Sequence, residues 1–314
     1  MRTFCCRICI ALAVLIAMTA RAQQPSALPM EPMPSPATQT SGDESSPPTN
    51  DVDELGQLVL LQTAPAHKVF RATSDTQYLY TSNRLLLPDS GIFPATSDAL
   101  LFQTFELSVS PQLLDKLITT IFIRQQLARY YRDDQLNFDA QAAGLQLAYP
   151  VQHWFTAYGG FSASRMFFDD GDKEFFKMYD TQFGVYRSDA ICSHASLFYG
   201  YQVDWRPSSP SILDSVNNSL YAGLNVTLLQ KLTGQVLYRL SVQDYQQPTR
   251  SAIGGPLLDR SDLNNMVSVS LTYAFCDYLS VRGYFDYVHN DSNVSTRDYA
   301  VVDGGGGLTV SVRF

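Results

Sequence analysis

Four histidines are the side chains best suited to general acid-base chemistry: His67, His153, His194 and His289. A serine hydrolase also needs a nucleophilic serine, an orienting acid and donors for the oxyanion. His194 lies close to Ser196, and His289 lies close to Ser292. Neither spacing marks an orienting acid or an oxyanion donor. We therefore expect the chain not to be an enzyme.

An acidic stretch could hold a hard cation such as calcium, since Asp169, Asp170, Asp172 and Glu174 lie close together. It lacks the ordered spacing of an EF-hand, and we expect it to be a solvated loop tip. The glycine run 304–307 is not a phosphate loop, because no Lys-Ser/Thr pair or following helix accompanies it. It is better suited to bending a strand or receiving an aromatic ring. No motif predicts a metal or another cofactor.

The elements that would position these residues show a period of two from Val69 onward. In 308–314, for example, Leu, Val, Val and Phe alternate with Thr, Ser and Arg. Such alternation predicts strands with one apolar face. We expect about twelve, with ten or fourteen as alternatives, because Gln125, Asp139 and Gln141 interrupt the early pattern. The expected strands are Val69–Tyr80, Leu101–Val109, Leu117–Tyr130, Phe138–Tyr149, Phe155–Met166, Phe176–Tyr186, Ala195–Trp205, Leu220–Leu228, Gly234–Gln243, Val267–Phe275, Leu279–Tyr287 and Leu308–Phe314.

The connections alternate in length, with short turns near 111–115, 150–153, 188–193, 230–231 and 276–278. Longer polar loops occupy 83–98, 206–216, 246–262 and 290–297. Short turns at one end and long loops at the other are typical of a transmembrane barrel. Aromatic residues also gather near strand ends, where interfacial girdles lie. They include Tyr130, Tyr131, Tyr149, Trp154, Phe155, Phe167, Phe168, Phe175, Phe176, Tyr186, Trp205, Tyr245, Phe275 and Tyr278.

Eight charged residues fall on the polar face of these strands. In hydrocarbon each Arg would cost about 2–4 kcal/mol at mid-depth, so we expect all eight to face a wet interior. They could line a pore, or pair with one another and close the lumen. They are Glu106, Arg124, Asp180, Asp204, Arg239, Arg282, Asp286 and Arg313.

Composition supports a membrane barrel over a soluble sheet protein. Only 17% of the 314 residues are charged, against about 25% in ordinary soluble domains. The net charge of −8 argues against nucleic-acid binding, which needs clustered Lys and Arg. The longest apolar run, Ile8 to Ala20, is shorter than the roughly 18 residues of a membrane helix.

The N-terminal fifth of the chain divides into two expected segments. Residues 1–22 combine Arg2 and Arg7, an apolar run and an Ala-Arg-Ala cleavage pattern, which predicts a signal peptide. Residues 23–66 are rich in Pro, Ser and acids and predict a disordered periplasmic leader. Its apolar patch 52–61 could be a docking peptide or plug helix, but we expect a marginal helix without a role. Residues 67–314 then form the barrel, in which Cys192 and Cys276 are expected to be free.

The final strand, Gly304–Phe314 (GGGGLTVSVRF), resembles the C-terminal strand of Gram-negative outer-membrane β-barrel proteins. The hairpin 272–293 (TYAFCDYLSVRGYFDYVHNDSN) with 298–307 (DYAVVDGGGG) is similar to porin-type barrels associated with exopolysaccharide gene clusters. The broad resemblance implies an all-β, up-and-down antiparallel barrel in the bacterial outer membrane, with both termini periplasmic. It also implies that Phe314 is a signal for the barrel-insertion machinery.

We therefore expect a porin-like channel for passive diffusion of small polar solutes. The alternative is a structural or surface-interaction barrel, which could serve polysaccharide export. The expected partners are outer-membrane lipid, the insertion machinery and small polar solutes, with no nucleic acid. A homo-oligomer stays open.

Overall fold

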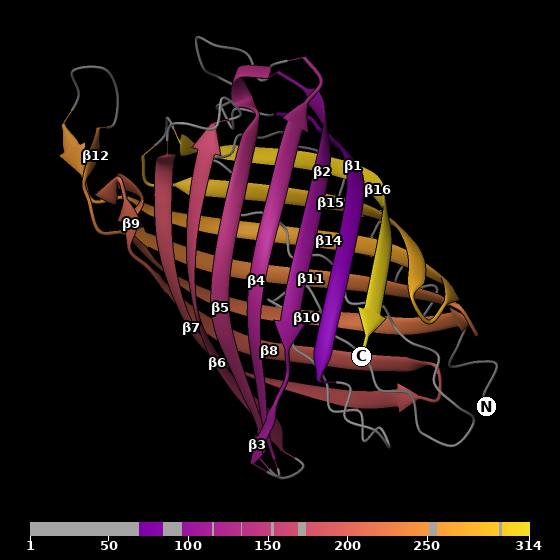
Figure 1. Cartoon of the computed structure of the whole chain (residues 1–314). Coiled ribbons are helices and arrows are strands. Elements are labelled where there is room, and N and C mark those ends of the chain that lie inside the picture. Colours follow the sequence, from indigo (N-terminus) through magenta and orange to yellow (C-terminus); the bar gives the residue numbers. More distant parts are fainter. Residues whose placement is uncertain are drawn as a thin grey trace.

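Twelve long strands, each antiparallel to its neighbours, close into one barrel (Figure 1). This computed structural model describes residues 69–83, 96–114, 116–132, 134–151, 154–168, 174–250, 256–294 and 297–314. The expected fold class and strand count are confirmed. The long strands are β1 (Phe70–Thr81), β2 (Asp98–Val109), β4 (Leu117–Tyr130), β5 (Phe138–Val151), β6 (Phe155–Phe168), β7 (Glu174–Cys192), β8 (Ala195–Arg206), β10 (Ser215–Leu229), β11 (Leu232–Tyr245), β14 (Ser261–Cys276), β15 (Leu279–Ser292) and β16 (Tyr299–Arg313).

The barrel closes where β1 meets β16. Residues 71–81 pair in continuous register with residues 313–303. Just beyond this ladder, the backbone N–H of Phe70 donates to the carbonyl of Phe314 and the reverse bond is also made, both at 3.0 Å. The two rings stack with centroids 5.8 Å apart. No backbone edge is therefore left open along the seam.

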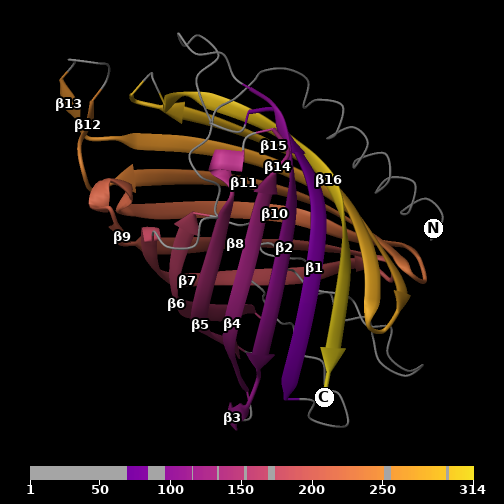
Figure 2. The same ribbon diagram turned by 45° about the horizontal axis from the view of Figure 1, so that its top comes forward.

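The two ends of the barrel differ. Phe70 begins the first strand of the barrel, and Phe314 directly follows the last. Both residues lie on the side of the barrel with the short connections 193–194, 230–231 and 277–278, here called the turn end. The opposite loop end carries 207–214 and 246–260. Short strands lie at both ends of the barrel. Figures 1 and 2 show that β3 projects at the end opposite to the β12–β13 hairpin. These elements are β3 (Gln112–Leu114), β9 (Ser208–Ser209), β12 (Thr249–Arg250), β13 (Leu257–Leu258) and the 3-10 turns Asp134–Leu136 and Ser211–Leu213.

Several strands extend beyond the alternating apolar stretches that predicted them. The expected turn at 188–193 is wrong, because β7 continues to Cys192 and the turn is only 193–194. In this extension Arg187 and Asp189 form an ion pair, with Nη2 2.8 Å from Oδ1. Polar residues can continue a strand where it leaves the apolar belt. Hydrophobic periodicity therefore located the middle of each strand better than its ends.

The outer and inner faces have opposite chemistry. The alternating residues Leu308, Val310, Val312 and Phe314 are exposed on the outer face, whereas Thr309 and Ser311 are buried on the inner face. The same division holds along the other strands. An apolar outer wall matches hydrocarbon, and polar residues face the interior. Within the described residues, no helix is long and apolar enough to cross a bilayer.

Most of the expected girdle aromatics do lie outside, but not all. Trp154, Trp205 and Tyr278 are more than half exposed near strand ends. Tyr186 is buried in an inner cluster with Tyr158, Phe198, Tyr221 and Leu237, and Tyr130 packs against a second inner cluster. The prediction was also wrong for Tyr245, the register partner of the buried Ser215, which faces inward against Arg260. It failed for these three tyrosines because position near a strand end does not decide which face a side chain occupies.

Inner aromatic rings lie flat over glycines on neighbouring strands. Tyr221 is paired in register with Gly200, and Tyr158 with Gly184. A Cβ added at Gly200 would lie 2.4 Å from Tyr221 Oη and 2.4 Å from the backbone oxygen of Val185. Only glycine leaves room for such a ring against the wall. The rings thereby cover the wall instead of crossing the interior.

The glycine run 304–307 behaves partly in the same way. A Cβ at Gly305 would lie 2.3 Å from the carbonyl oxygen of Tyr78 and 3.0 Å from Tyr284 Oη. Gly305 is also the register partner of Tyr284. This glycine therefore admits both an aromatic side chain and a closely approaching strand at the seam.

We predict that Gly200→Ala lowers the stability of the folded barrel by about 1–3 kcal/mol, the usual cost of overpacking. Gly283→Ala is the matched control, since its nearest neighbour to a new Cβ is 4.0 Å away. The measurement is the temperature at which the purified protein loses its fast-migrating folded form in detergent gel electrophoresis. Equal melting of the two variants would contradict the close-packing explanation.

Candidate functional site

All eight predicted charged residues lie on the inner face of their strands, as the alternation of exposed and buried neighbours shows. Glu106, Asp204, Arg282 and Asp286 are buried, and the other four are partly buried. The strands bring several of them together and leave others apart. Whether they line a solute path stays a prediction.

Glu106 and Arg124 form an ion pair across β2 and β4. The two residues are register partners, and Arg124 donates from Nε and Nη2 to Glu106 Oε2 at 3.0 and 2.8 Å. The Glu106 side chain is only 3% exposed and that of Arg124 14%. A carboxylate removed from water this far depends on its partner for compensation.

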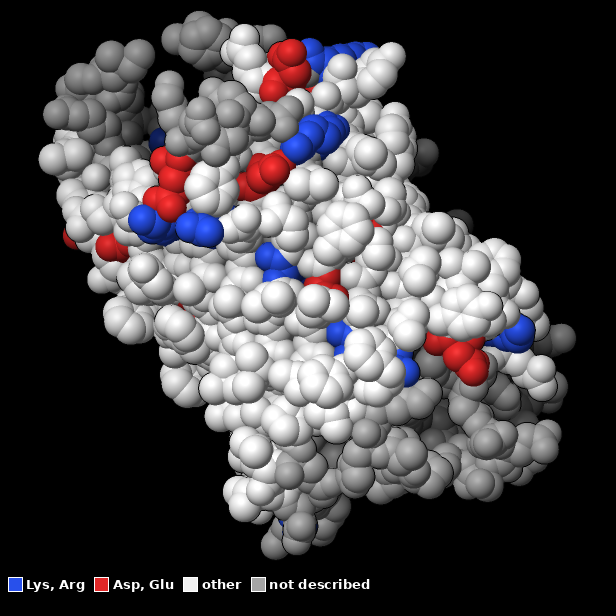
Figure 3. Space-filling model, in the orientation of Figure 1, with Lys and Arg blue, Asp and Glu red and all other residues white. Residues whose placement is uncertain are grey.

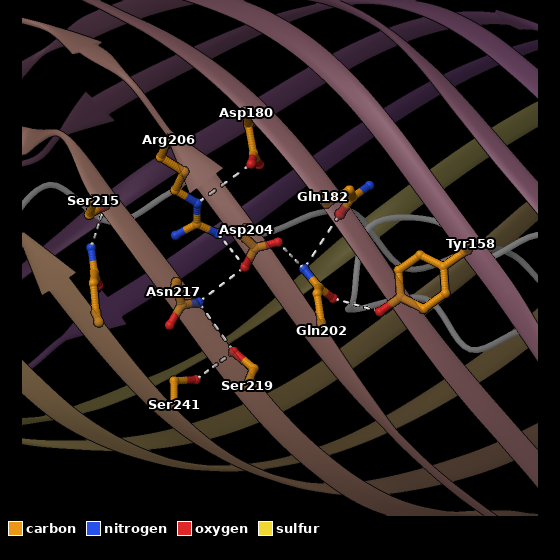
Figure 4. A network of polar contacts seen from close by, with 11 residues as sticks. Tyr158, Asp180, Gln182, Gln202, Asp204, Arg206, Ser215, Asn217, Ser219 and Ser241 are labelled. Atoms are coloured by element: carbon orange, nitrogen blue, oxygen red, sulfur yellow. Dashed lines mark hydrogen bonds and ion pairs between the residues drawn. The ribbon is translucent and has the colours of Figure 1, made fainter.

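A larger polar network covers the inner face of β7, β8 and β10 (Figure 4). Its centre is Asp204, 1% exposed, which accepts hydrogen bonds from Gln202 and Asn217 at 2.5 and 3.1 Å. Arg206 lies between two carboxylates, with Nη2 3.3 Å from Asp204 and Nε 3.7 Å from Asp180. The predicted acids Asp180 and Asp204 thus share one cation that the sequence analysis did not select.

The network extends in both directions from Asp204. Toward the turn end, Gln202 accepts a hydrogen bond from the Tyr158 hydroxyl at 2.9 Å. On the other side, Asn217 donates to Ser219, whose hydroxyl lies 2.9 Å from that of Ser241. The chain of contacts therefore crosses from β6 to β11. It fixes the orientation of neutral and charged groups alike along half of the inner wall.

A third cluster lies at the loop end. Arg260 Nε donates to Asp262 at 2.9 Å, and its guanidinium lies 4.0 Å from the centre of the Tyr245 ring. Asp262 also accepts a bond from Asn290 at 3.3 Å. Burial and the nearby Arg260 lower the pKa of Arg297 in the adjoining loop. Positive and negative groups therefore alternate at this mouth of the barrel.

The seam side of the interior places like charges opposite one another. Arg71 and Arg313 are register partners near the turn end. Asp286 and Asp303 are register partners farther toward the loop end, 1% and 0% exposed. Arg282 lies with its guanidinium carbon 4.8 Å from the centre of the Tyr284 ring. This wall is thus cationic near the turns and acidic nearer the loops.

Comparison with known proteins was made at the level of sequence and of structure. No family model and no curated protein matches the sequence. Among solved structures, an outer-membrane channel from Pseudomonas putida F1 matches 80% of this chain and 100% of its own, with a TM-score of 0.53 and 8% identity. The chain has the fold of an outer-membrane β-barrel.

Lower-scoring similarities point to barrels of several kinds. The translocator domain of the autotransporter NalP from Neisseria meningitidis matches 78% of this chain and 88% of its own, with a TM-score of 0.44 and 11% identity. The KdgM porin in complex with disordered oligogalacturonate matches 77% and 99%, with a TM-score of 0.40 and 10% identity. We draw no functional argument from these scores.

In this outer-membrane β-barrel, the two described histidines have partners other than the serines first considered. His194 lies in an exposed turn with Nδ1 2.8 Å from Ser193 Oγ, whereas Ser196 is buried on the inner face. His289 Nε2 lies 3.3 Å from Asp291 Oδ1. Asp291 is thus an acid near His289 that the sequence analysis did not mark, and Ser292 Oγ accepts a bond from the Val294 backbone instead.

Other predictions fall outside the described residues. These are the signal peptide 1–22, the leader 23–66 with its patch 52–61, His67, His153 and residues 169–173 of the acidic stretch. Cys192 and Cys276 are free, as expected. In the part of the chain that the structure describes, no group of three or more His, Cys, Asp or Glu is placed to hold a metal ion.

Sequence reasoning missed several inner charges of the barrel. Arg71 and Asp75 have the inward parity of an expected strand and could have been selected by it. Asp98, Asp262 and Asp303 precede the apolar stretches that marked β2, β14 and β16, and Arg206 follows the one that marked β8. Hydrophobic periodicity fails at strand ends, and these four inner charges of the loop half lie there.

We predict that Arg124→Gln destabilises the barrel by about 3–5 kcal/mol, because it leaves Glu106 buried without its cation. Combining it with Glu106→Gln should restore part of the loss. The control is Arg129→Gln on the same strand, whose pair with Asp139 has both side chains 34% exposed and should be worth about 0–1 kcal/mol. Thermal unfolding of the parent, Arg124→Gln, Glu106→Gln and the double variant measures the coupling, and strict additivity would contradict a buried pair.

Proposed function

We propose that the protein is an outer-membrane channel for passive diffusion of small polar solutes. The main support for this proposal is the contrast between an apolar outer wall and an inner wall that bears charged and amide groups. Such groups need an interior that water or polar solutes can enter, since they would be costly in hydrocarbon. The fold shared with a bacterial outer-membrane channel supports the proposal.

The location follows from the same reasoning. Outer-membrane lipid contacts the apolar outer wall, and the turn end with both barrel termini faces the periplasm. Phe314, 64% exposed on the outer face, would present the insertion signal at that side. Self-association of the barrel stays a prediction.

The lumen is narrow, and its wall carries both acidic and basic groups. Asp204, Asp286 and Asp303 are each no more than 1% exposed, so much of the charged wall is covered by neighbouring side chains. A twelve-stranded barrel also has a smaller diameter than the larger porins. We therefore propose that only small solutes pass, through a field set by opposing acidic and basic groups.

The alternative is a structural or surface-interaction barrel, which could serve polysaccharide export. It is favoured by the mutual pairing of inner charges, as in Glu106–Arg124 and in Arg206 with its two carboxylates. In both proposals the protein is not an enzyme. The two differ in whether ions can cross the barrel.

We predict that the purified protein, inserted in a planar lipid bilayer, produces steady ohmic current steps. Their conductance should be small, because the inner charges leave a narrow path. Protein heated to unfolding before addition provides the control for insertion artefacts. A silent membrane, with folded protein shown to be inserted, would refute the channel and leave the structural alternative.

We predict that Arg239→Glu and Arg282→Glu each shift the ion selectivity toward cations, because each replaces an inner positive charge with a negative one. Arg187→Glu is the control, since Arg187 lies on the outer face in its pair with Asp189. The measurement is the reversal potential under a salt gradient. Unchanged values in both inner variants would show that these side chains do not line the path.

A further inference from the structure

The outer wall carries a hollow that the channel proposal does not use. It has a volume of about 900 Å3 and crosses β16, β1, β2, β4, β5, β6 and β7. Figure 3 shows this side of the molecule, most of which is covered by uncharged residues. The floor includes the small side chains Ala143 and Ala163, which are register partners on β5 and β6. Larger residues such as Ile123 and Tyr179 border them in the same cross-strand row.

The next row toward the loop end is polar on four successive strands. Gln125 pairs in register with Gln141, Gln141 with Arg165, and Arg165 with Lys177. All four residues line the hollow and point outward. This polar row is what interrupted the alternation of the early strands in the sequence. It borders an apolar depression on a wall that is otherwise suited to hydrocarbon.

The row contains two cations directly opposite each other. Like charges at opposed positions of neighbouring strands destabilise a sheet. Lys177 has a carboxylate partner, Glu174, at 2.8 Å. Among the described residues, Arg165 donates to a neutral group, with Nε and Nη2 3.0 and 2.7 Å from Gln141 Oε1, and its guanidinium carbon lies 5.2 Å from the centre of the Phe167 ring. Counted over the described residues, the pair keeps a surplus positive charge, and two of the five guanidinium N–H groups of Arg165 are used in these bonds.

The position of Arg165 and Lys177 along their strands indicates which kind of acceptor they bind. Arg165 and Lys177 each lie three residues from the loop-side end of their strand, about 10 Å along the chain. On a membrane-crossing strand, a position this near the end lies closer to the lipid headgroups than to the bilayer midplane. An Arg or Lys here costs about 0–1 kcal/mol, much less than at mid-depth. An anion at headgroup level would convert that cost into a favourable, charge-assisted contact.

We propose that the hollow is a binding site for one phosphorylated lipid of the outer leaflet. Its phosphate contacts Arg165 and Lys177, and one acyl chain lies over Ala143 and Ala163. Gln141 holds the guanidinium in place between phosphate and wall. The proposal rests on the membrane location and orientation proposed above. It does not depend on whether the lumen conducts.

The test uses the whole folded barrel in detergent, titrated with diphosphoryl lipid A and followed by native mass spectrometry. R165Q/K177Q should weaken binding at least tenfold. Arg187→Gln is the matched control, because it removes an outward-facing arginine at the turn end, and it should bind as the parent does. Equal binding by the double variant and the control would overturn the proposal.

Two further experiments test the acyl-chain contact and the phosphate contact one at a time. Ala163→Trp fills the floor without removing charge and should also weaken lipid binding, and unchanged affinity would refute the acyl-chain contact. Inorganic phosphate in large excess should fail to displace the lipid, and full displacement would mean a free-anion site instead. Each variant is first shown to be folded by its heat-dependent gel mobility. Conductance retained in R165Q/K177Q keeps failure of this proposal distinct from failure of the channel.

Discussion

The structure depends on one constraint: every backbone N–H and C=O within hydrocarbon must be bonded to another strand. Closure at β1–β16 meets that constraint for the one pair of described long strands that are not consecutive in sequence. Once the sheet is closed, alternation along each strand assigns half of the side chains to lipid and half to the interior. The separation of chemistry between the two walls is thus a consequence of backbone hydrogen bonding.

The fold was predictable because this assignment repeats from one strand to the next through the barrel. Each of the twelve alternating stretches became a strand, and the outer face was identified by residues such as Leu308 and Val310. The ends were less predictable, since Asp98, Arg206 and Asp262 stand where the apolar signal fades. Tyr186 was misplaced because an aromatic ring suits either a girdle or an inner cluster, and only packing over the neighbouring wall decides between them.

The candidate site was predictable in composition but not in pairing. Parity selected Glu106 and Arg124 and also placed Asp180 and Asp204 on the same wall. That Glu106 faces Arg124 depends on the register of β2 against β4. That Arg206 serves two acids depends on the register of β7 against β8, in which Thr181 pairs with Trp205. Neither register is encoded in a period of two. The interruptions at Gln125 and Gln141, which weakened the strand prediction, mark instead a polar row on the outer wall.

The β1–β16 seam also affects how fast the barrel can fold. The Arg71 side chain donates to Ser311 across 240 positions of sequence, whereas every other junction between long strands joins consecutive ones. Loop-closure entropy makes such a distant contact slow to form. The eleven other junctions between long strands join consecutive strands and can form locally as hairpins, so pairing of β1 with β16 is the contact that completes the barrel. Until it forms, the sheet has two unpaired edges, and the lifetime of that state sets the opportunity for misassembly.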